Sequence, residues 1–245
     1  MPEIVLRDFL EAGVQFGHPA RRWNPKMAPF IFRERNGIHI IDLRQTAERL
    51  HQTFAAVTDT VRHGESVLFV GTKKAAQESI ALEAARCGSP YVTVRWMGGL
   101  LTNFRTIESR LRRMKELEGM EERGELDKLP TREAQVLRDD LRRMQRNLGG
   151  MRDMTRLPGL LFVVDTRGER LALAEAHRLQ IPVIGLVDTN CDPDEVDYPI
   201  PSNDDGMRAI HLMCRYIADA VIEARQELES IQAKTDDAPL VSSAS

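Results

Sequence analysis

The residues of this chain best suited to binding a ligand are cations that stand beside aromatic rings. Residues 21–35 contain one carboxylate, aromatic rings that include Trp23 and Phe30, and five cations, namely Arg21, Arg22, Lys26, Arg33 and Arg35. Arginine pairs bidentately with phosphate, and an exposed aromatic ring offers a surface on which a base can stack. Because prolines interrupt the segment, it cannot hide these side chains along a helix. The pattern favours single-stranded or irregular RNA as the ligand.

Positive charge recurs at other places in the chain. Arg95 and Trp96 follow a predicted strand, and residues 142–156 hold five arginines against Asp153 alone. The turn at residues 71–74 could offer amides and two lysines to a phosphate, although an ordinary turn with solvated lysines is the simpler interpretation. Each patch alone is typical of a solvated surface, but together they favour RNA over an enzyme pocket. The candidate RNA-binding residues are Arg21, Arg22, Trp23, Lys26, Arg33, Arg35, Lys73, Lys74, Arg95, Trp96, Asn103, Arg105, Arg142, Arg143 and Arg146.

Negative charge is concentrated in residues 188–205, which contain seven acids and no lysine or arginine. Outward-pointing carboxylates screened by solvent are one explanation. The alternative is a structural divalent cation held by Asp188, Asp204 and Asp205, with Mg²⁺ suited to oxygen ligands and Zn²⁺ favoured if His18 reaches the cluster. A calcium loop of the EF-hand type is excluded, because the sequence has proline where that loop needs glycine and glutamate. No cofactor is required by any motif.

Composition and motif content narrow the function classes. The 245 residues carry a net charge of −3 and are 42% hydrophobic, values typical of a globular protein. No apolar run approaches the ~20 residues of a membrane helix, and no signal peptide is expected. Three widely spaced cysteines argue against a disulfide framework and a thiolate zinc site. Glycine-rich nucleotide loops and a nucleophile elbow are also missing, so we expect a cytoplasmic protein without a small-molecule substrate.

The elements that must position these residues follow from hydrophobic periodicity. A helix over 4–13 precedes an irregular, proline-containing stretch over 14–29, and Asn36-Gly37 predicts a β-hairpin between two apolar runs. A helix follows from Asp42 to Gly64. Buried strands are predicted at 67–70, 91–94, 159–165 and 181–188, and helices at 73–87, 168–179 and about 204–231. Apolar strands that alternate with helices indicate an α/β fold with a doubly wound parallel sheet.

One insertion interrupts this alternation between the second and third strands. Apolar residues recur at spacings of three and four over 107–114 and 137–151, with glycines and a proline between the two series. This pattern predicts a protruding antiparallel coiled-coil hairpin. The predicted domains are a discontinuous α/β body over 1–102 and 157–232, a helical hairpin over 103–156 and a disordered tail over 233–245.

Several long segments resemble the bacterial small-subunit ribosomal protein two family. These segments are FLEAGVQFGH (9–18), RRWNPKM (21–27), NGIHIID (36–42), FVGTKK (69–74), RWMGGLLTNF (95–104), VDTNCDP (187–193) and IPSNDD (200–205). The resemblance is collinear over about 5–225, although Gln15 and Pro19-Ala20 depart from the usual pattern. It implies a flavodoxin-like body with a coiled coil and a structural role on small-subunit (16S) rRNA, among other small-subunit proteins. In many bacteria it also implies recruitment of ribosomal protein one.

A metal-dependent phosphoryl-transfer enzyme is the competing hypothesis. Asp165 and Asp188 end two predicted strands, which is where magnesium-dependent enzymes of this fold class carry acids. A phosphohydrolase needs a paired Asp-x-Asp at such a strand end, and neither Asp165 nor Asp188 is followed by a second aspartate two residues later. Assays for phosphatase and nucleotide hydrolysis, beside co-sedimentation with small ribosomal subunits, distinguish the two hypotheses.

Overall fold

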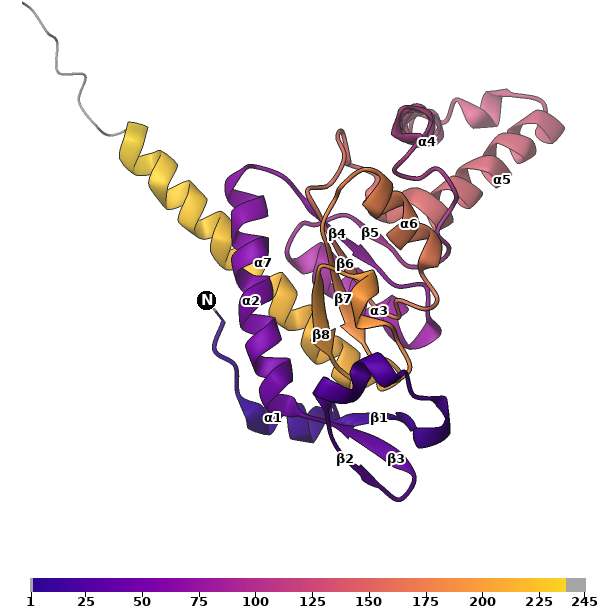
Figure 1. Cartoon of the computed structure of the whole chain (residues 1–245). Coiled ribbons are helices and arrows are strands. Elements are labelled where there is room, and N and C mark those ends of the chain that lie inside the picture. Colours follow the sequence, from indigo (N-terminus) through magenta and orange to yellow (C-terminus); the bar gives the residue numbers. More distant parts are fainter. Residues whose placement is uncertain (1, 237–245) are drawn as a thin grey trace, which may run out of the picture.

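Five short apolar segments pair in parallel at the centre of the protein (Figure 1). The computed structural model describes residues 2–236, with side chains over 2–230. The strands are β4 (Val67–Val70), β5 (Tyr91–Val92), β6 (Leu160–Val163), β7 (Val183–Val187) and β8 (Tyr198–Pro201). Their order across the sheet is β5-β4-β6-β7-β8, which is the order of flavodoxin-like folds. The predicted α/β class with a parallel sheet is therefore confirmed.

The fifth strand is absent from the sequence-based prediction. β8 contains Pro199 and Pro201 and pairs in parallel with β7 at one edge of the sheet. Proline cannot donate a ladder hydrogen bond, so it is confined to edge strands and strand ends. The prolines that made this segment look like a loop are compatible with a strand only because it lies at the edge.

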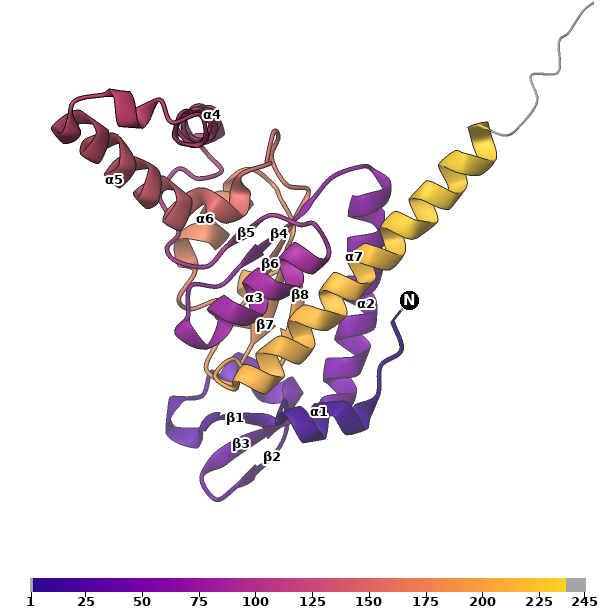
Figure 2. The same cartoon turned by 180° about the vertical axis from the view of Figure 1, so that it is seen from behind.

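Helices cover both faces of the sheet, because successive side chains of each strand point to opposite faces. Phe69 and Phe162 point into one core with α1, α2, α3 and α7, whereas Leu68 and Leu161 point into a second core with α4, α5 and α6. Figure 2 shows α3 and α7 side by side on the first face. The helices are α1 (Leu6–Ala12), α2 (Leu43–Arg62), α3 (Lys74–Arg86), α4 (Phe104–Glu122), α5 (Thr131–Leu148), α6 (Arg170–Arg178) and α7 (Met207–Asp236).

The last helix is longer than the sequence predicts. α7 continues to Asp236, so residues 233–236, which were assigned to a disordered tail, are helical. The rest of that predicted tail, 237–245, lies outside the described residues. Among the helices of residues 2–236, none combines the length and hydropathy that crossing a membrane requires.

A small antiparallel sheet lies beside one end of the body and includes the predicted hairpin. Its strands are β1 (Phe16–Pro19), β2 (Ile31–Arg35) and β3 (Ile38–Ile41), in the order β1-β3-β2. Asn36 (φ 53°) and Gly37 (φ 74°) form the left-handed turn that the sequence predicted. β1 corrects the prediction of an irregular stretch, since Gly17 and Pro19 do not prevent pairing with β3 at a sheet edge. After β1 the chain forms two 3-10 helices, η1 (Ala20–Arg22) and η2 (Pro25–Phe30).

The insertion between β5 and β6 is helical, as predicted, but it does not form the expected coiled coil. In Figures 1 and 2 α4 is seen nearly end-on while α5 lies across the view, so the two helices cross. Buried residues of both helices, among them Ile107, Leu111 and Leu148, belong to the same core cluster as the second face of the sheet. The predicted apolar seam is thus buried against the body as well as between the helices.

Truncating Phe162 tests the first core. This fully buried side chain of the central strand β6 contacts Phe69 edge to face, with ring centroids 5.3 Å apart. We expect Phe162→Ala to lower the free energy of unfolding by about 3–5 kcal/mol, through lost burial and a cavity. Phe32→Ala, at a side chain that is 58% exposed, is the matched control and should cost little. Urea denaturation measures both, and equal effects would contradict this assignment of the core.

Candidate functional site

The basic arm, which we define as residues 20–35, is held on the body by the small antiparallel sheet of β1, β2 and β3. Arg21 and Arg22 lie on η1, and Arg33 and Arg35 lie on β2. All four side chains are exposed, and among the described residues none of these guanidinium groups forms an ion pair with a carboxylate. Their charge is therefore available to an external anion.

Trp23 supplies an aromatic surface within the basic arm. Its indole stacks on the ring of His39 on β3, with centroids 5.1 Å apart and planes 20° from parallel. The His39 side chain is buried beneath it, whereas Trp23 remains 39% exposed. A ring that is supported on one face and partly open to solvent suits stacking against an unpaired base.

Lys26 differs from the four arginines because it is already paired. Its ammonium lies 2.8 Å from Asp192 Oδ2 and 2.8 Å from Asp194 Oδ2. Both aspartates belong to the acidic loop, which we define as residues 188–205 and which includes the 3-10 helix η5 (Pro193–Glu195). These carboxylates raise the pKa of Lys26, and the Lys26 ammonium in turn lowers the pKa of Asp192. Lys26 thus joins the basic arm to the acidic loop and contributes less free charge than the sequence suggests.

The two predicted lysines after β4 have different surroundings. Lys74 is exposed at the start of α3, whereas Lys73 is ion-paired with Asp204 at 2.8 Å and with Asp205. Burial alone would lower the pKa of Lys73, but these carboxylates raise it well above its usual range. The expectation that Lys73 offers its charge to RNA does not fit this structure, because that charge is taken up inside the protein.

Trp96 also departs from its predicted role as a surface ring. It is only 5% exposed, and its Nε1–H donates to Glu175 Oε1 of α6 at 3.1 Å. The same carboxylate accepts the backbone N–H groups of Gly99 at 2.8 Å and Leu101 at 2.9 Å. Burial alone would raise the pKa of Glu175, but these donors lower it below its usual value. Trp96 and Glu175 fix the loop between β5 and α4 and do not present a stacking surface.

Glu175→Gln tests this structural role. Glutamine keeps one acceptor oxygen and places an NH₂ group against N–H donors, so we expect a loss of about 2–4 kcal/mol of stability at neutral pH. Because the folded-state pKa of Glu175 is depressed, its stabilising contribution exists above the unfolded pKa and disappears as the pH falls through the folded value. The difference between wild type and variant should therefore shrink in acid. Chemical denaturation at several pH values measures it, with exposed Glu133→Gln as control; a pH-independent difference would contradict this assignment.

The other predicted RNA-binding residues lie on the insertion side of the molecule. Arg95, Asn103, Arg105 and Arg146 are exposed, and the three arginines form no ion pair among the described residues. The Asn103 side-chain oxygen accepts a hydrogen bond from the Thr106 hydroxyl at 2.9 Å. Arg142 and Arg143 are exposed as well, but each pairs with a carboxylate one turn earlier on α5, Asp139 and Asp140 respectively. Exposed pairs of this kind are worth about 0–1 kcal/mol, so they can open for a phosphate. This surface is separate from the basic arm, which lies toward the opposite end in Figure 1.

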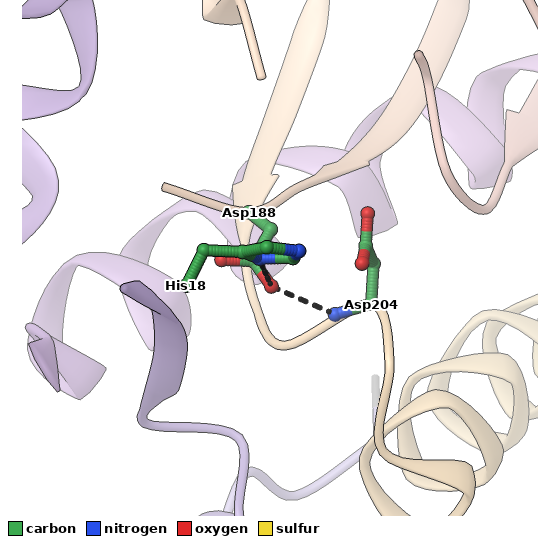
Figure 3. Close-up of side chains that lie close together, drawn as sticks. All are labelled: His18, Asp188 and Asp204. Carbon is green, nitrogen blue, oxygen red and sulfur yellow. Dashed lines mark hydrogen bonds and ion pairs between the residues drawn. The ribbon is translucent and has the colours of Figure 1, made fainter. Parts of the chain in front are cut away.

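The predicted acids gather at the carboxyl ends of the strands. Asp188 follows β7 and is 1% exposed, and Asp204 precedes α7 and is 2% exposed. Asp188 Oδ2 accepts the backbone N–H of Asp204 at 3.3 Å (Figure 3). Burial raises the pKa of Asp204 to about 6, the charge of Asp188 adds to this rise, and Lys73 opposes it. Asp205 is exposed and pairs with Lys73, which lowers its pKa.

His18 belongs to this cluster, although the sequence offered it only as a conditional member. Its Nδ1 lies 3.0 Å from Asp188 Oδ2 and its Nε2 lies 3.3 Å from Asp205 Oδ2. The neighbouring Gly17 permits this approach, because a Cβ there would lie 2.5 Å from the Thr189 side chain. The backbone N–H of His18 donates to Thr189 Oγ1 at 2.9 Å. The glycine immediately before His18 is the sequence signal for the close approach.

Comparison with known protein families identifies this architecture. The family model described as Ribosomal protein S2 matches residues 9–224. The match begins in α1 and ends in α7, and it includes the basic arm, the parallel sheet, the helical insertion and the acidic cluster. The chain therefore belongs to the ribosomal protein S2 family, whose members are structural proteins of the small ribosomal subunit and act in translation.

Proposed function

We propose that this protein binds the rRNA of the small ribosomal subunit and that the basic arm is its main electrostatic contact. The observation that carries the proposal is the group of four exposed arginines without carboxylate partners, set around a half-exposed Trp23. Phosphate contacts supply most of the affinity for nucleic acid, and a supported ring adds stacking on an unpaired base. The exposed arginines near α4 and α5 provide a second, smaller contact surface.

The basic arm is fixed to the body before any RNA binds. The Asn24 N–H donates to the Thr189 carbonyl at 2.7 Å, and Lys26 bridges Asp192 and Asp194. These contacts join the arm to the loop that follows β7. A positioned set of cations loses less conformational entropy on binding than a flexible tail does, so the arrangement favours RNA affinity.

The proposal also covers partners, location and activity. The protein works on cytoplasmic ribosomes beside other small-subunit proteins, with ribosomal protein one among its partners, and without a membrane or a small-molecule substrate. It acts by binding and not by catalysis, since the family consists of structural ribosomal proteins.

Co-sedimentation tests the proposal directly. The purified chain should sediment with small ribosomal subunits that lack it, and binding to isolated small-subunit rRNA should weaken steeply as salt increases. Phosphatase and nucleotide-hydrolysis assays run in parallel should give only background rates. Failure to sediment, or hydrolysis that depends on Asp188, would instead favour the phosphoryl-transfer hypothesis.

A further inference from the structure

Three segments far apart in the sequence bring metal-binding side chains together. His18 comes from β1, Asp188 follows β7, and Asp204 precedes α7 (Figure 3). One potential ligand atom from each of the three side chains lies within 4.8 Å of the other two. This separation is short enough for one ion to contact all three after small side-chain adjustments. Asp205, which the sequence placed among the ligands, is exposed at the edge of the group.

The charges around this cluster do not balance. Four carboxylates gather there, those of Asp165, Asp188, Asp204 and Asp205, and Lys73 is the one lysine or arginine ion-paired with them in the part of the chain that the structure describes. A protonated His18 would add only one further positive charge. Asp188 and Asp204 are nearly completely buried, and buried charges are paired or bind metals. The cluster therefore has at least two negative charges in excess, which a divalent cation would neutralise.

His18 supplies a second and independent observation. Its side chain is 14% exposed, and its Nδ1 is buried without a hydrogen-bond partner although Asp188 lies 3.0 Å away. Its other nitrogen, Nε2, lies 3.3 Å from the Asp205 carboxylate. Histidine ligands of metals commonly bind through one ring nitrogen and donate the other N–H to a carboxylate, which fixes the ring. His18 has a carboxylate beside each nitrogen and so fits that arrangement.

We propose that His18, Asp188 and Asp204 bind one divalent metal ion, with Zn²⁺ preferred over Mg²⁺, and that Asp205 orients His18. An imidazole nitrogen among the ligands selects zinc over magnesium, which prefers oxygen ligands alone. Three protein ligands leave a coordination position for water. Lys73 holds Asp204 through Oδ1, so the other oxygen of that carboxylate stays free of this ion pair.

The site has a structural consequence for the basic arm. The metal would join β1, directly before the arm, to the carboxyl end of the sheet and to the start of α7. It would act together with the contacts of Thr189 and Lys26 that already hold the arm on this edge. Metal binding should therefore stabilise the fold and order the segment that follows His18.

Metal titration of the purified full chain tests the proposal. After removal of metal with a chelator, we expect one Zn²⁺ to bind per chain, and Mg²⁺ to bind far more weakly, by isothermal titration calorimetry. His18→Gln and Asp188→Asn should lower the Zn²⁺ affinity by at least about 100-fold, and Asp205→Asn by about 10–100-fold. His63→Gln, at an exposed histidine on the far end of α2, and Asp153→Asn, at an exposed carboxylate outside the cluster, are matched controls and should bind as wild type.

A measurement on the unaltered protein covers the case in which a variant does not fold. Co²⁺ substituted for Zn²⁺ should shift or broaden the NMR signals of the His18 ring much more than those of His63. The proposal is overturned if no metal binds above background, if folded His18→Gln binds Zn²⁺ normally, or if Co²⁺ leaves the His18 signals unchanged. Preferential binding of Mg²⁺ would also overturn it, since the imidazole would then play no part.

Discussion

Replacing Arg21, Arg22 and Arg33 with alanine is expected to weaken binding to small-subunit rRNA strongly and to flatten its salt dependence. Each arginine that neutralises a phosphate releases counterions, and each contact contributes about 0.7–0.9 to the slope of log K against log salt concentration. Loss of three contacts should therefore lower that slope by about 2–3. These side chains are exposed and form no ion pairs with carboxylates, so the fold should remain stable. Filter binding or fluorescence anisotropy over a range of salt concentrations measures the change.

A variant of equal charge provides the control for this prediction. Arg7, Arg62 and Arg123 are exposed arginines on or beside α1, α2 and α4, and each pairs with a glutamate. Replacing these three with alanine removes the same formal charge from other surfaces and should leave the slope almost unchanged. An equal loss in both triple variants would mean that the binding follows net charge and not the basic arm.

Lys26→Ala separates two roles that the sequence assigns to one residue. Because Lys26 bridges Asp192 and Asp194, its removal should change the salt slope less than removal of a single arginine does. It should instead loosen the basic arm from the acidic loop, which faster hydrogen exchange at the backbone N–H of Asn24 would report. A slope change as large as that for Arg21→Ala would show that Lys26 contacts phosphate despite its partners.

The sequence predicts the parallel sheet well because most of its strands are continuous apolar runs that can be recognised locally. The apolar runs that contain β4, β6 and β7 are buried on both faces, and that burial requires continuous hydrophobicity. β8 escapes prediction because its burial comes from pairing with β7 at the sheet edge, while its prolines resemble those of a loop. The sequence also fails to predict that α4 and α5 cross, because this too depends on contacts between elements. A spacing of three and four residues shows that one helix face is apolar, but not what that face packs against.

The candidate RNA-binding residues were predicted by charge type, and charge type alone does not indicate pairing. Trp96 donates a hydrogen bond to Glu175, which is 79 residues away in the sequence, and Lys73 is paired with Asp204, which is 131 residues away. Residues so far apart in the sequence are brought together by the fold, and the residues around each of them show no local sequence pattern that would reveal the pairing. The basic arm is different, because its prolines and short strands keep its arginines at the surface. That segment could therefore be identified from its sequence.

Replacing residues 104–150 with a short Gly-Ser linker is expected to unfold the protein, against the sequence-based expectation of an independent body and hairpin. α4 and α5 contribute six buried side chains to the second core: Ile107, Leu111, Met114, Leu117, Leu141 and Leu148. At about 1.5–3 kcal/mol each, their burial is worth up to about 9–18 kcal/mol. That amount is comparable with the whole stability of a typical domain. Circular dichroism and urea denaturation should show loss of cooperative unfolding.

Removal of the tip alone distinguishes this result from a general intolerance of deletions. The segment over 123–130 joins α4 to α5 and contains the 3-10 helix η3 (Leu126–Lys128), and Leu126 is its one buried residue. Replacing this segment with a linker of equal length should leave the body folded, because the six buried side chains that α4 and α5 contribute to the second core remain in place. If removal of 104–150 also left a cooperatively folded protein, then the second face of the sheet would not need this cover. The insertion would then be a separate domain, and its role would be confined to contacts outside the chain.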